Sequence, residues 1–312
     1  MPLLKRRREL ALKHEATKGT FNAPAVDGTE SKFIIVDPTF TTEFGVYERD
    51  IVRSDFTRLA HRIVSKKVSL KFGFEVRRQN VTDTPDQWGK ILQICGFKET
   101  INAATSVVYG PTSDLAVMKA GSIYYWMDGL RVAMKGCMGA ISFRGEVGGI
   151  GMWDVDISGA FQAVADDPLN TVSHEAAIPP AFQGINFSYA ASTARCINSI
   201  GINFNNAVSE RRCANDATAI SYFLITGRNP ELTIDPELEL AATYDFYTAL
   251  EAGTEVAASF SLGSTLAFAM PKVQKKNIAE QERSGITVAG ITAGINTGGA
   301  AGGDDEFTLT CT

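Results

Sequence analysis

The 312-residue chain has few of the residues from which catalytic and metal sites are built. Its three histidines, His14, His61 and His174, have no metal-like spacing, and we interpret them as surface or partly buried side chains. The sequence contains no GxSxG elbow, no HExxH motif and no phosphate-binding P-loop. We therefore expect no catalytic residue, no cofactor and no metal site.

Cysteine pairs and long apolar runs are also lacking. The five cysteines are scattered, odd in number and without CxxC spacing, which argues against a disulfide framework and a zinc site. No stretch approaches the ~18 apolar residues needed to span a bilayer. The basic run at residues 5–8 is followed by charged residues, so it does not resemble a secretory signal. We expect a soluble protein without a membrane partner, made in its cell's or its host's cytoplasm.

An excess of positive charge is absent as well. The 30 lysines and arginines are outnumbered by 35 aspartates and glutamates, which gives a formal net charge of −5. Because proteins that grip DNA carry a basic patch for the phosphates, this balance disfavours DNA binding as the function. The hydrophobic fraction of 45% is ordinary for a folded chain, and this length usually means two domains.

The second half of the chain repeats the plan of the first. Residues 46–50 (Val-Tyr-Glu-Arg-Asp) are echoed by residues 208–212 (Val-Ser-Glu-Arg-Arg). Each echo follows an alternating run and precedes a strand pattern that ends in arginine, at Arg77 and Arg228. The repeat is much longer than a solenoid unit of ~20 to 50 residues. It indicates two copies of one small domain.

Strand patterns dominate both copies. Residues 68–76 and 152–158 alternate apolar and polar side chains at period two, and Phe33–Val36 is a further apolar run. One helix is expected in each copy, over 85–95 with Thr84 as its N-cap and over 236–250.

We predict a mainly β fold with two tandem β-sandwich domains, each with a flanking α-helix. The predicted division is an N-terminal arm at 1–30 with a short helix from Lys5 to Lys13, a first domain at 31–162, a linker at 163–180 and a second domain at 181–312. Two charged segments, 45–60 and 205–218, are predicted to be exposed loops of functional length.

Several short motifs resemble the tail-tube domain of long-tailed bacteriophages. The second half carries most of them, and the first half adds 135–143 and 157–159. The second-half stretches are 225–230 (ITGRNP), 235–237 (DPE), 261–263 (SLG), 269–272 (AMPK), 282–286 (ERSGI) and 303–310 (GDDEFTLT). The first half departs from the family pattern in a long insert at Ile51–Lys67.

The resemblance implies a structural virion protein rather than an enzyme. Such subunits stack in rings, and their sheets join to line a tube through which viral DNA is ejected. The two-domain form implies a homotrimer with pseudo-six-fold symmetry. Its implied partners are further copies of itself and other tail proteins, such as the tape measure, terminator and baseplate. DNA would pass through the lumen without specific binding.

Two sets of residues follow as site candidates. Carboxylates that would face the DNA and repel it are lumen-lining candidates: Glu146, Asp154, Asp156, Asp304, Asp305 and Glu306. Charged residues of the arm and of the two exposed segments are inter-ring contact candidates: Lys5, Arg6, Arg7, Arg8, Glu48, Arg49, Asp50, Glu210, Arg211 and Arg212.

Other functions remain open at this stage. A related possibility is another tail-tube-like ring protein, such as a tail completion or baseplate hub protein. A carbohydrate-binding β-sandwich would need aromatics on one face, but the consecutive Tyr124, Tyr125 and Trp126 cannot all share one. An enzyme on a β scaffold is the remaining class.

Overall fold

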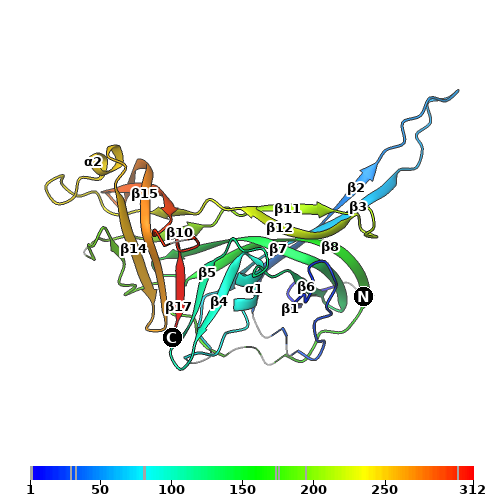
Figure 1. The fold of residues 1–312 in the computed structure, drawn as a ribbon, viewed down its shortest axis with the longest axis horizontal. Helices are drawn as coiled ribbons and strands as arrows, with labels where there is room; N and C mark the ends of the chain where they lie inside the picture. The colour runs from blue at the N-terminus through cyan, green and yellow to red at the C-terminus, as the bar shows by residue number, and fades with distance from the viewer. Residues whose placement is uncertain are drawn as a thin grey trace.

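The computed structural model describes residues 3–28, 30–31, 34–79, 82–172, 174, 176–193, 195–300 and 302–312. The fold is mainly β, as predicted, and its paired strands are antiparallel (Figure 1). Phe33, the first residue of one predicted strand run, lies outside the described residues.

The first half contains eight strands and one short helix. They are β1 (Arg8–His14), β2 (Val36–Tyr47), β3 (Arg62–Glu75), α1 (Gly89–Ile94), β4 (Phe97–Asn102), β5 (Ser106–Pro111), β6 (Gly121–Met127), β7 (Leu130–Glu146) and β8 (Met152–Asp166).

The second half contains nine strands and one short helix. They are β9 (Ser188–Tyr189), β10 (Ser199–Asn203), β11 (Ala207–Arg212), β12 (Ile220–Gly227), β13 (Glu231–Ile234), α2 (Phe246–Glu251), β14 (Glu255–Leu262), β15 (Leu266–Arg283), β16 (Ile286–Asn296) and β17 (Thr308–Cys311).

The two halves pair their strands in the same order. The first half runs β2-β3-β8-β7, and the second half runs β10-β13-β16-β15. The last strand of each series also pairs with the strand before it in the chain: β7 with β6, and β15 with β14. The C-terminal part of β7 pairs with β10, so eight strands form one continuous sheet across both halves. The sheet then returns to the first half through β17, β5 and β4.

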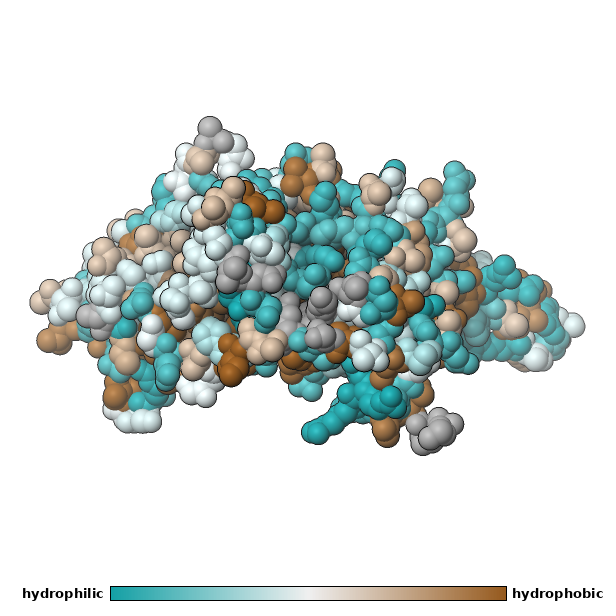
Figure 2. Space-filling view, turned by 90° about the horizontal axis from the view of Figure 1, so that it is seen from below, coloured by the Kyte–Doolittle hydropathy of each residue, from teal (hydrophilic) through white to brown (hydrophobic). Residues whose placement is uncertain are grey.

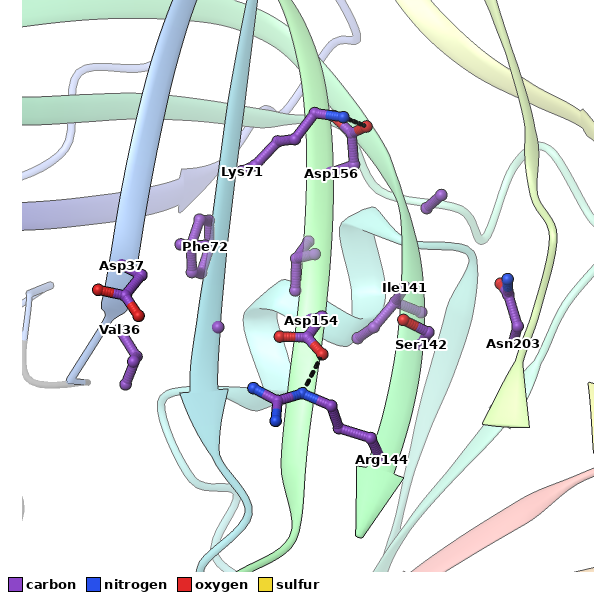
Figure 3. A pocket seen from close by; sticks show the side chains of 13 residues that line it. Val36, Asp37, Lys71, Phe72, Ile141, Ser142, Arg144, Asp154, Asp156 and Asn203 are labelled. Atoms are coloured by element: carbon purple, nitrogen blue, oxygen red, sulfur yellow. Dashed lines mark hydrogen bonds and ion pairs between the residues drawn. The ribbon is translucent and has the colours of Figure 1, made fainter. Parts of the chain in front are cut away.

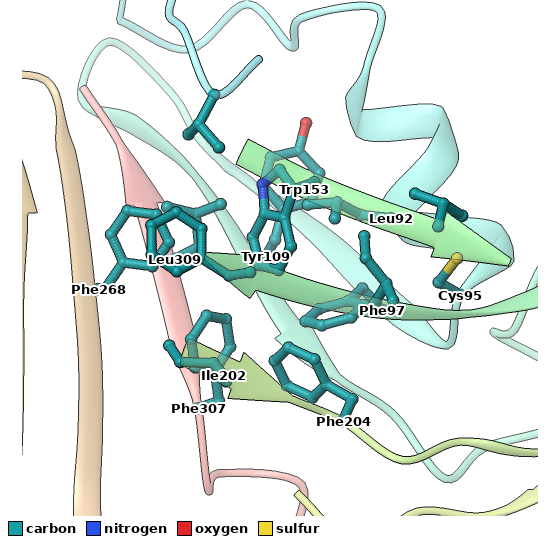
Figure 4. Packing of buried hydrophobic residues seen from close by; sticks show 14 of the residues in the cluster. Leu92, Cys95, Phe97, Tyr109, Trp153, Ile202, Phe204, Phe268, Phe307 and Leu309 are labelled. Carbon is teal, nitrogen blue, oxygen red and sulfur yellow. The ribbon is translucent and has the colours of Figure 1, made fainter. Parts of the chain in front are cut away.

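The two halves also share a hydrophobic core. Trp153 of the first half lies in the same buried cluster as Phe204, Phe268 and Phe307 of the second (Figure 4). Phe143 of the first half belongs to this cluster too. The ring centroids of Phe143 and Phe268 are 5.0 Å apart, within the range of favourable aromatic contacts. Strand β8 continues to Asp166, inside the range predicted as a linker, and the domain boundaries themselves stay a prediction.

Both predicted helices are shorter than expected, and their predicted starts are wrong. The first helix begins only at Gly89, because the buried Asp86 carboxylate binds the Arg78 guanidinium and the backbone N–H of Gln79 instead of allowing a helical turn from Thr84. The second begins after Asp245, whose carboxylate caps the N–H groups of the first turn. The stretch after Pro236 instead bonds along the edge of β16.

The helix expected over Lys5–Lys13 is also wrong. Residues 8–14 form β1, which pairs with β6. Leu10 and Leu12 face the main core, whereas Ala11 packs with Tyr124 on the other side. A strand buried on both faces shows a continuous apolar run rather than a period-two pattern, and three residues are too few to reveal it.

The two charged segments take different forms. Segment 205–218 is not a loop throughout, since β11 forms within it and pairs with β12. This hairpin lies over β7 and β8, where Phe223 and Ile225 bury Met138 and Ala160. The other hairpin, β2–β3, projects from the body of the protein with its loop at 48–61 (Figure 1).

Candidate functional site: a polar face shared by eight strands

One side of the eight-stranded sheet carries polar side chains on strands of both halves, apart from the part of β7 and β8 that the β11–β12 hairpin covers. On β8, Val155 and Ile157 point into the core, whereas Asp154 and Asp156 point to the opposite side, as the alternation predicted. The strand register aligns these carboxylates with polar or small residues of β3 and β7. We call this side of the strands β2-β3-β8-β7-β10-β13-β16-β15 the polar face.

Both aspartates of β8 are paired with basic residues of neighbouring strands. The Lys71 Nζ of β3 lies 2.7 Å from Asp156 Oδ2, and the Arg144 Nε of β7 lies 2.6 Å from Asp154 Oδ2 (Figure 3). The hydrogen bond from Lys71 to Asp156 and the attraction between their charges raise the pKa of Lys71. Both pairs border a shallow hollow of about 500 Å³, which Asn203 of β10 also lines.

The pattern continues towards the projecting hairpin. Lys67 of β3 lies 2.7 Å from Glu43 of β2. Hydrogen bonds from Lys67 and from the hydroxyl of Ser69 lower the pKa of Glu43, so this carboxylate stays ionised at neutral pH. Further along β7, Lys135 pairs at 2.6 Å with Asp216, which lies in the loop of the β11–β12 hairpin.

The second half has matching pairs on the same side of the sheet. Lys276 of β15 reaches Glu231 of β13 at 2.7 Å, across the intervening strand β16. Arg283 forms two contacts, 3.2 Å to Asp235 and 3.0 Å to Glu237. A longer contact of 3.4 Å joins Lys272 to Glu255 of β14.

The six predicted lumen-lining carboxylates fall into two places. Asp154 and Asp156 lie on the polar face, and Glu146 lies at the end of β7, where it accepts a hydrogen bond from Asn198. The other three are grouped before β17. Asp304 and Glu306 both bind Arg228, and the Asp305 carboxylate accepts hydrogen bonds from residues 297–300.

The carboxylates before β17 therefore organise a loop. Burial opposes ionisation of Asp304, but hydrogen bonds from Ser113 and Arg228 outweigh it and lower the pKa of Asp304. For Asp305, hydrogen bonds from Thr297 and from backbone N–H groups lower the pKa. The Asp304 side chain connects the β16–β17 loop to Arg228 and to the first half at Ser113, whereas Asp305 bonds within the loop.

The predicted inter-ring residues are nearly all exposed, but several already have partners within the chain. Arg7 pairs with Asp128 at 2.7 Å, and Arg8 begins β1, whereas Lys5 and Arg6 are exposed. In the β2–β3 loop, Glu48 pairs with Arg58, and Arg49 and Asp50 are exposed. On the β11–β12 hairpin, Glu210 pairs with Arg212, and the Arg211 guanidinium lies 5.0 Å from the centre of the Tyr222 ring.

A buried cationic cluster was missed from the sequence. Lys275 of β15 and Arg195 are both almost fully buried, and both lie over the ring of Tyr244, 4.8 Å and 4.2 Å from its centre. The Lys275 ammonium donates to Tyr244 Oη at 2.8 Å. Burial, together with the nearby charge of Arg195, lowers the pKa of Lys275 to about 8. Tyr189 and Phe246 complete this cluster, which we call the cationic box.

The described residues show neither a metal site nor a membrane span. No group of three or more histidine, cysteine, aspartate or glutamate side chains among them could hold a metal ion. Their helices are all too short to cross a bilayer. On the side seen from below, hydrophilic and hydrophobic residues are interspersed without one dominant hydrophobic patch (Figure 2).

A shared core, a long continuous sheet and a charge-paired polar face define a mainly β protein whose two halves form one body. The chain belongs to the phage tail tube protein family, whose family model matches residues 5–311. It is therefore a structural protein of the virion tail. A comparison with curated proteins found no match.

Proposed function

We propose that three chains associate edge to edge into a ring, that rings stack into the tail tube, and that DNA passes through it. The observation that carries this proposal is the repeated four-strand unit. Within one chain, the first unit joins the second through β7 and β10. The same junction between chains would join β15 of one copy to β2 of the next, and three chains would supply six such units.

The edges needed for this junction are available. In the described chain, β2 pairs only with β3, and the segment of β15 beyond Lys275 pairs only with β16. Most residues between Lys276 and Arg283 are exposed. Long unpaired edges of this kind make an isolated protein prone to aggregate, and closing the ring would pair them with neighbouring chains.

The register of the junction can be transferred from one repeat to the other. Arg144 of β7 and Arg283 of β15 each lie near the turn into the next strand. When these two are aligned, the strand pairing also aligns two buried core residues, Leu70 of β3 and Ile234 of β13. In the junction within the chain, Ser142 lies opposite Asn203. The corresponding pair between chains is Gln281 of one copy and Glu43 of the next.

The polar face is the surface that we assign to the lumen. Apart from the part of β7 and β8 that the β11–β12 hairpin covers, it extends across both repeats, so a closed ring would carry it around the circumference. Asp154 and Asp156 belong to it, and Glu146 lies at its margin, whereas Asp304, Asp305 and Glu306 serve the loop before β17. We therefore keep only the first three as lumen candidates.

Ring stacking is assigned to the projecting hairpin, with the exposed charges near the N-terminus as a second contact. Val52 and Phe56 in the β2–β3 loop are fully exposed, although both are apolar. Burying such side chains against a neighbouring ring removes apolar surface from water. A Val52→Asp/Phe56→Asp variant should fold normally and form rings, but it should assemble few or no tubes in electron micrographs. Normal tubes would contradict this role.

The ring itself is tested by a cysteine pair. Glu43→Cys combined with Gln281→Cys should link neighbouring chains on mild oxidation and give a covalent trimer on a denaturing gel. The control pairs Glu43→Cys with Glu282→Cys, because a shift of one residue places the second cysteine on the other side of the sheet. Equal linking in both, or none in assembled protein, would refute the junction.

Electron microscopy distinguishes the alternative within the same group of proteins. Long tubes of stacked rings support the tail tube, whereas single rings that do not stack support a tail completion or baseplate hub protein. The further partners that we propose are the tape measure, terminator and baseplate proteins of the same tail.

A further inference from the structure

The basic residues of the polar face share one property. In addition to Lys135 under the β11–β12 hairpin, six lysine and arginine side chains of β3, β7 and β15 on this face each have a carboxylate within 4 Å from a different segment of the chain. They are Lys67, Lys71, Arg144, Lys272, Lys276 and Arg283. Apart from the exposed Arg62 on the projecting hairpin, positive charge on this face is therefore accompanied by negative charge beside it.

Stability does not explain the most exposed of these pairs. The side chains of Lys71 and Asp156 are 64% and 45% exposed, and those of Arg144 and Asp154 are 63% and 42% exposed. Ion pairs with this much contact with water contribute little to folding, because the solvent screens the attraction and the long side chains lose entropy. The arrangement changes the electrostatic potential of the face instead.

One pair shows that the backbone makes room for the arrangement. Lys276 must cross β16 to reach Glu231, and it passes directly over Gly294. A Cβ atom at position 294 would lie 2.9 Å from the Lys276 Cε atom, so a side chain there would force the lysine side chain to shift. Glycine at this strand position permits the close approach.

We propose that these cross-strand pairs are built-in counterions, which prevent the lysines and arginines of the face from binding DNA phosphates. A free cation gains affinity for DNA by displacing condensed counterions from it, whereas a cation that already has a carboxylate partner gains much less. The inference rests on the proposed function, since it concerns the face assigned to the lumen. The expected lumen wall therefore does not repel DNA at its lysines and arginines, because the net charge around each of them is close to zero.

The test compares two double variants of the purified full-length protein. Asp154→Asn/Asp156→Asn leaves Lys71 and Arg144 without their acids, and Lys71→Gln/Arg144→Gln leaves the acids without their bases. Binding of a fluorescent 30-base-pair duplex is followed by anisotropy between 50 and 200 mM salt. Circular dichroism confirms that each variant is folded, which the exposure of these side chains leads us to expect.

Only the asparagine variant should bind the duplex. If both freed cations contact phosphates, the logarithm of the binding constant falls with that of the salt concentration at a slope of about −1.8 per chain, or about 12-fold over this range. Wild type and the glutamine variant should show no saturable binding. Equal binding by wild type and the asparagine variant, or no binding by the folded asparagine variant, would overturn the inference.

The outcome can be separated from that for the ring. If another face lines the lumen of the rings but the asparagine variant still gains DNA binding, the proposed function is wrong and the charge compensation is supported. If the polar face lines the lumen but the asparagine variant gains no DNA binding, the proposed function is supported and the charge compensation is wrong.

Discussion

Replacing Lys275 by methionine tests the energetics of the cationic box. The ammonium of Lys275 is almost fully buried beside Arg195, and its pKa is lowered from 10.5 to about 8. At neutral pH the folded protein therefore holds a charge that it would be more stable without. Methionine has a similar length and no charge, so Lys275→Met should relieve this penalty.

The magnitude follows from the pKa difference. A shift from 10.5 to about 8 corresponds to about 3 kcal/mol of penalty on the charged form. Methionine loses the hydrogen bond to Tyr244 Oη, which is worth about 1 kcal/mol. The variant should therefore be more stable than wild type by about 1 to 2 kcal/mol at pH 7.

The pH dependence gives the clearer signature. Below about pH 8, Lys275 is charged in both the folded and the unfolded protein, and the penalty is complete. Between about 8 and 10.5, only the unfolded chain holds the proton, so wild-type stability gains a contribution as pH rises. Lys275→Met lacks this contribution, and its advantage should shrink or vanish by pH 10.

Urea unfolding at pH 7, 8.5 and 10 measures the difference. Lys272→Met is the matched control, because Lys272 lies on the same strand but is substantially exposed beside Glu255. The control should show no gain at pH 7. A Lys275→Met variant that is less stable than wild type at pH 7, or whose advantage is the same at pH 10, would refute the reasoning.

Three further outcomes follow from the fold. Gly136→Ala should cost about 1–3 kcal/mol in urea unfolding, because φ is +60° there and the new Cβ would lie 2.6 Å from the Tyr222 Cα atom; an unchanged midpoint would contradict the packing of the β11–β12 hairpin. Phe268→Ala should cost about 3–5 kcal/mol within a single transition, because its core is shared by both halves, and two separate transitions would speak against a common core. Deleting residues 1–7 should leave the melting temperature unchanged, whereas deleting residues 1–14 should lower it strongly by removing β1, as circular dichroism would report.

The sequence was a good guide where the pattern is local. The alternation in β8 predicted which side of the strand Asp154 and Asp156 occupy, and the tail tube family follows from motifs spread along the chain. The predicted start of the first helix was wrong because Asp86 bonds to residues 78 and 79, and that of the second because the stretch after Pro236 bonds along β16.

The ion pairs of the polar face could not be read from the sequence. Lys71 and Asp156 are far apart in the chain and meet only through the register of β3 with β8. Lys275 was missed for a different reason, since lysine is rarely buried and nothing nearby in the sequence marks the aromatic residues that enclose it. Both features depend on strand pairing, for which a single sequence carries little information.

The covalent link between the two repeats affects how the tube can evolve and assemble. Since β7 and β10 already meet within one polypeptide, half of the junctions in a six-unit ring would form during folding, independently of protein concentration. Assembly would then need the encounter of three bodies rather than six. The two repeats would also be free to diverge, so a substitution in one would recur at every second position around the circumference. Such a ring could present two alternating outer surfaces, with three equivalent docking places for each kind of tail protein.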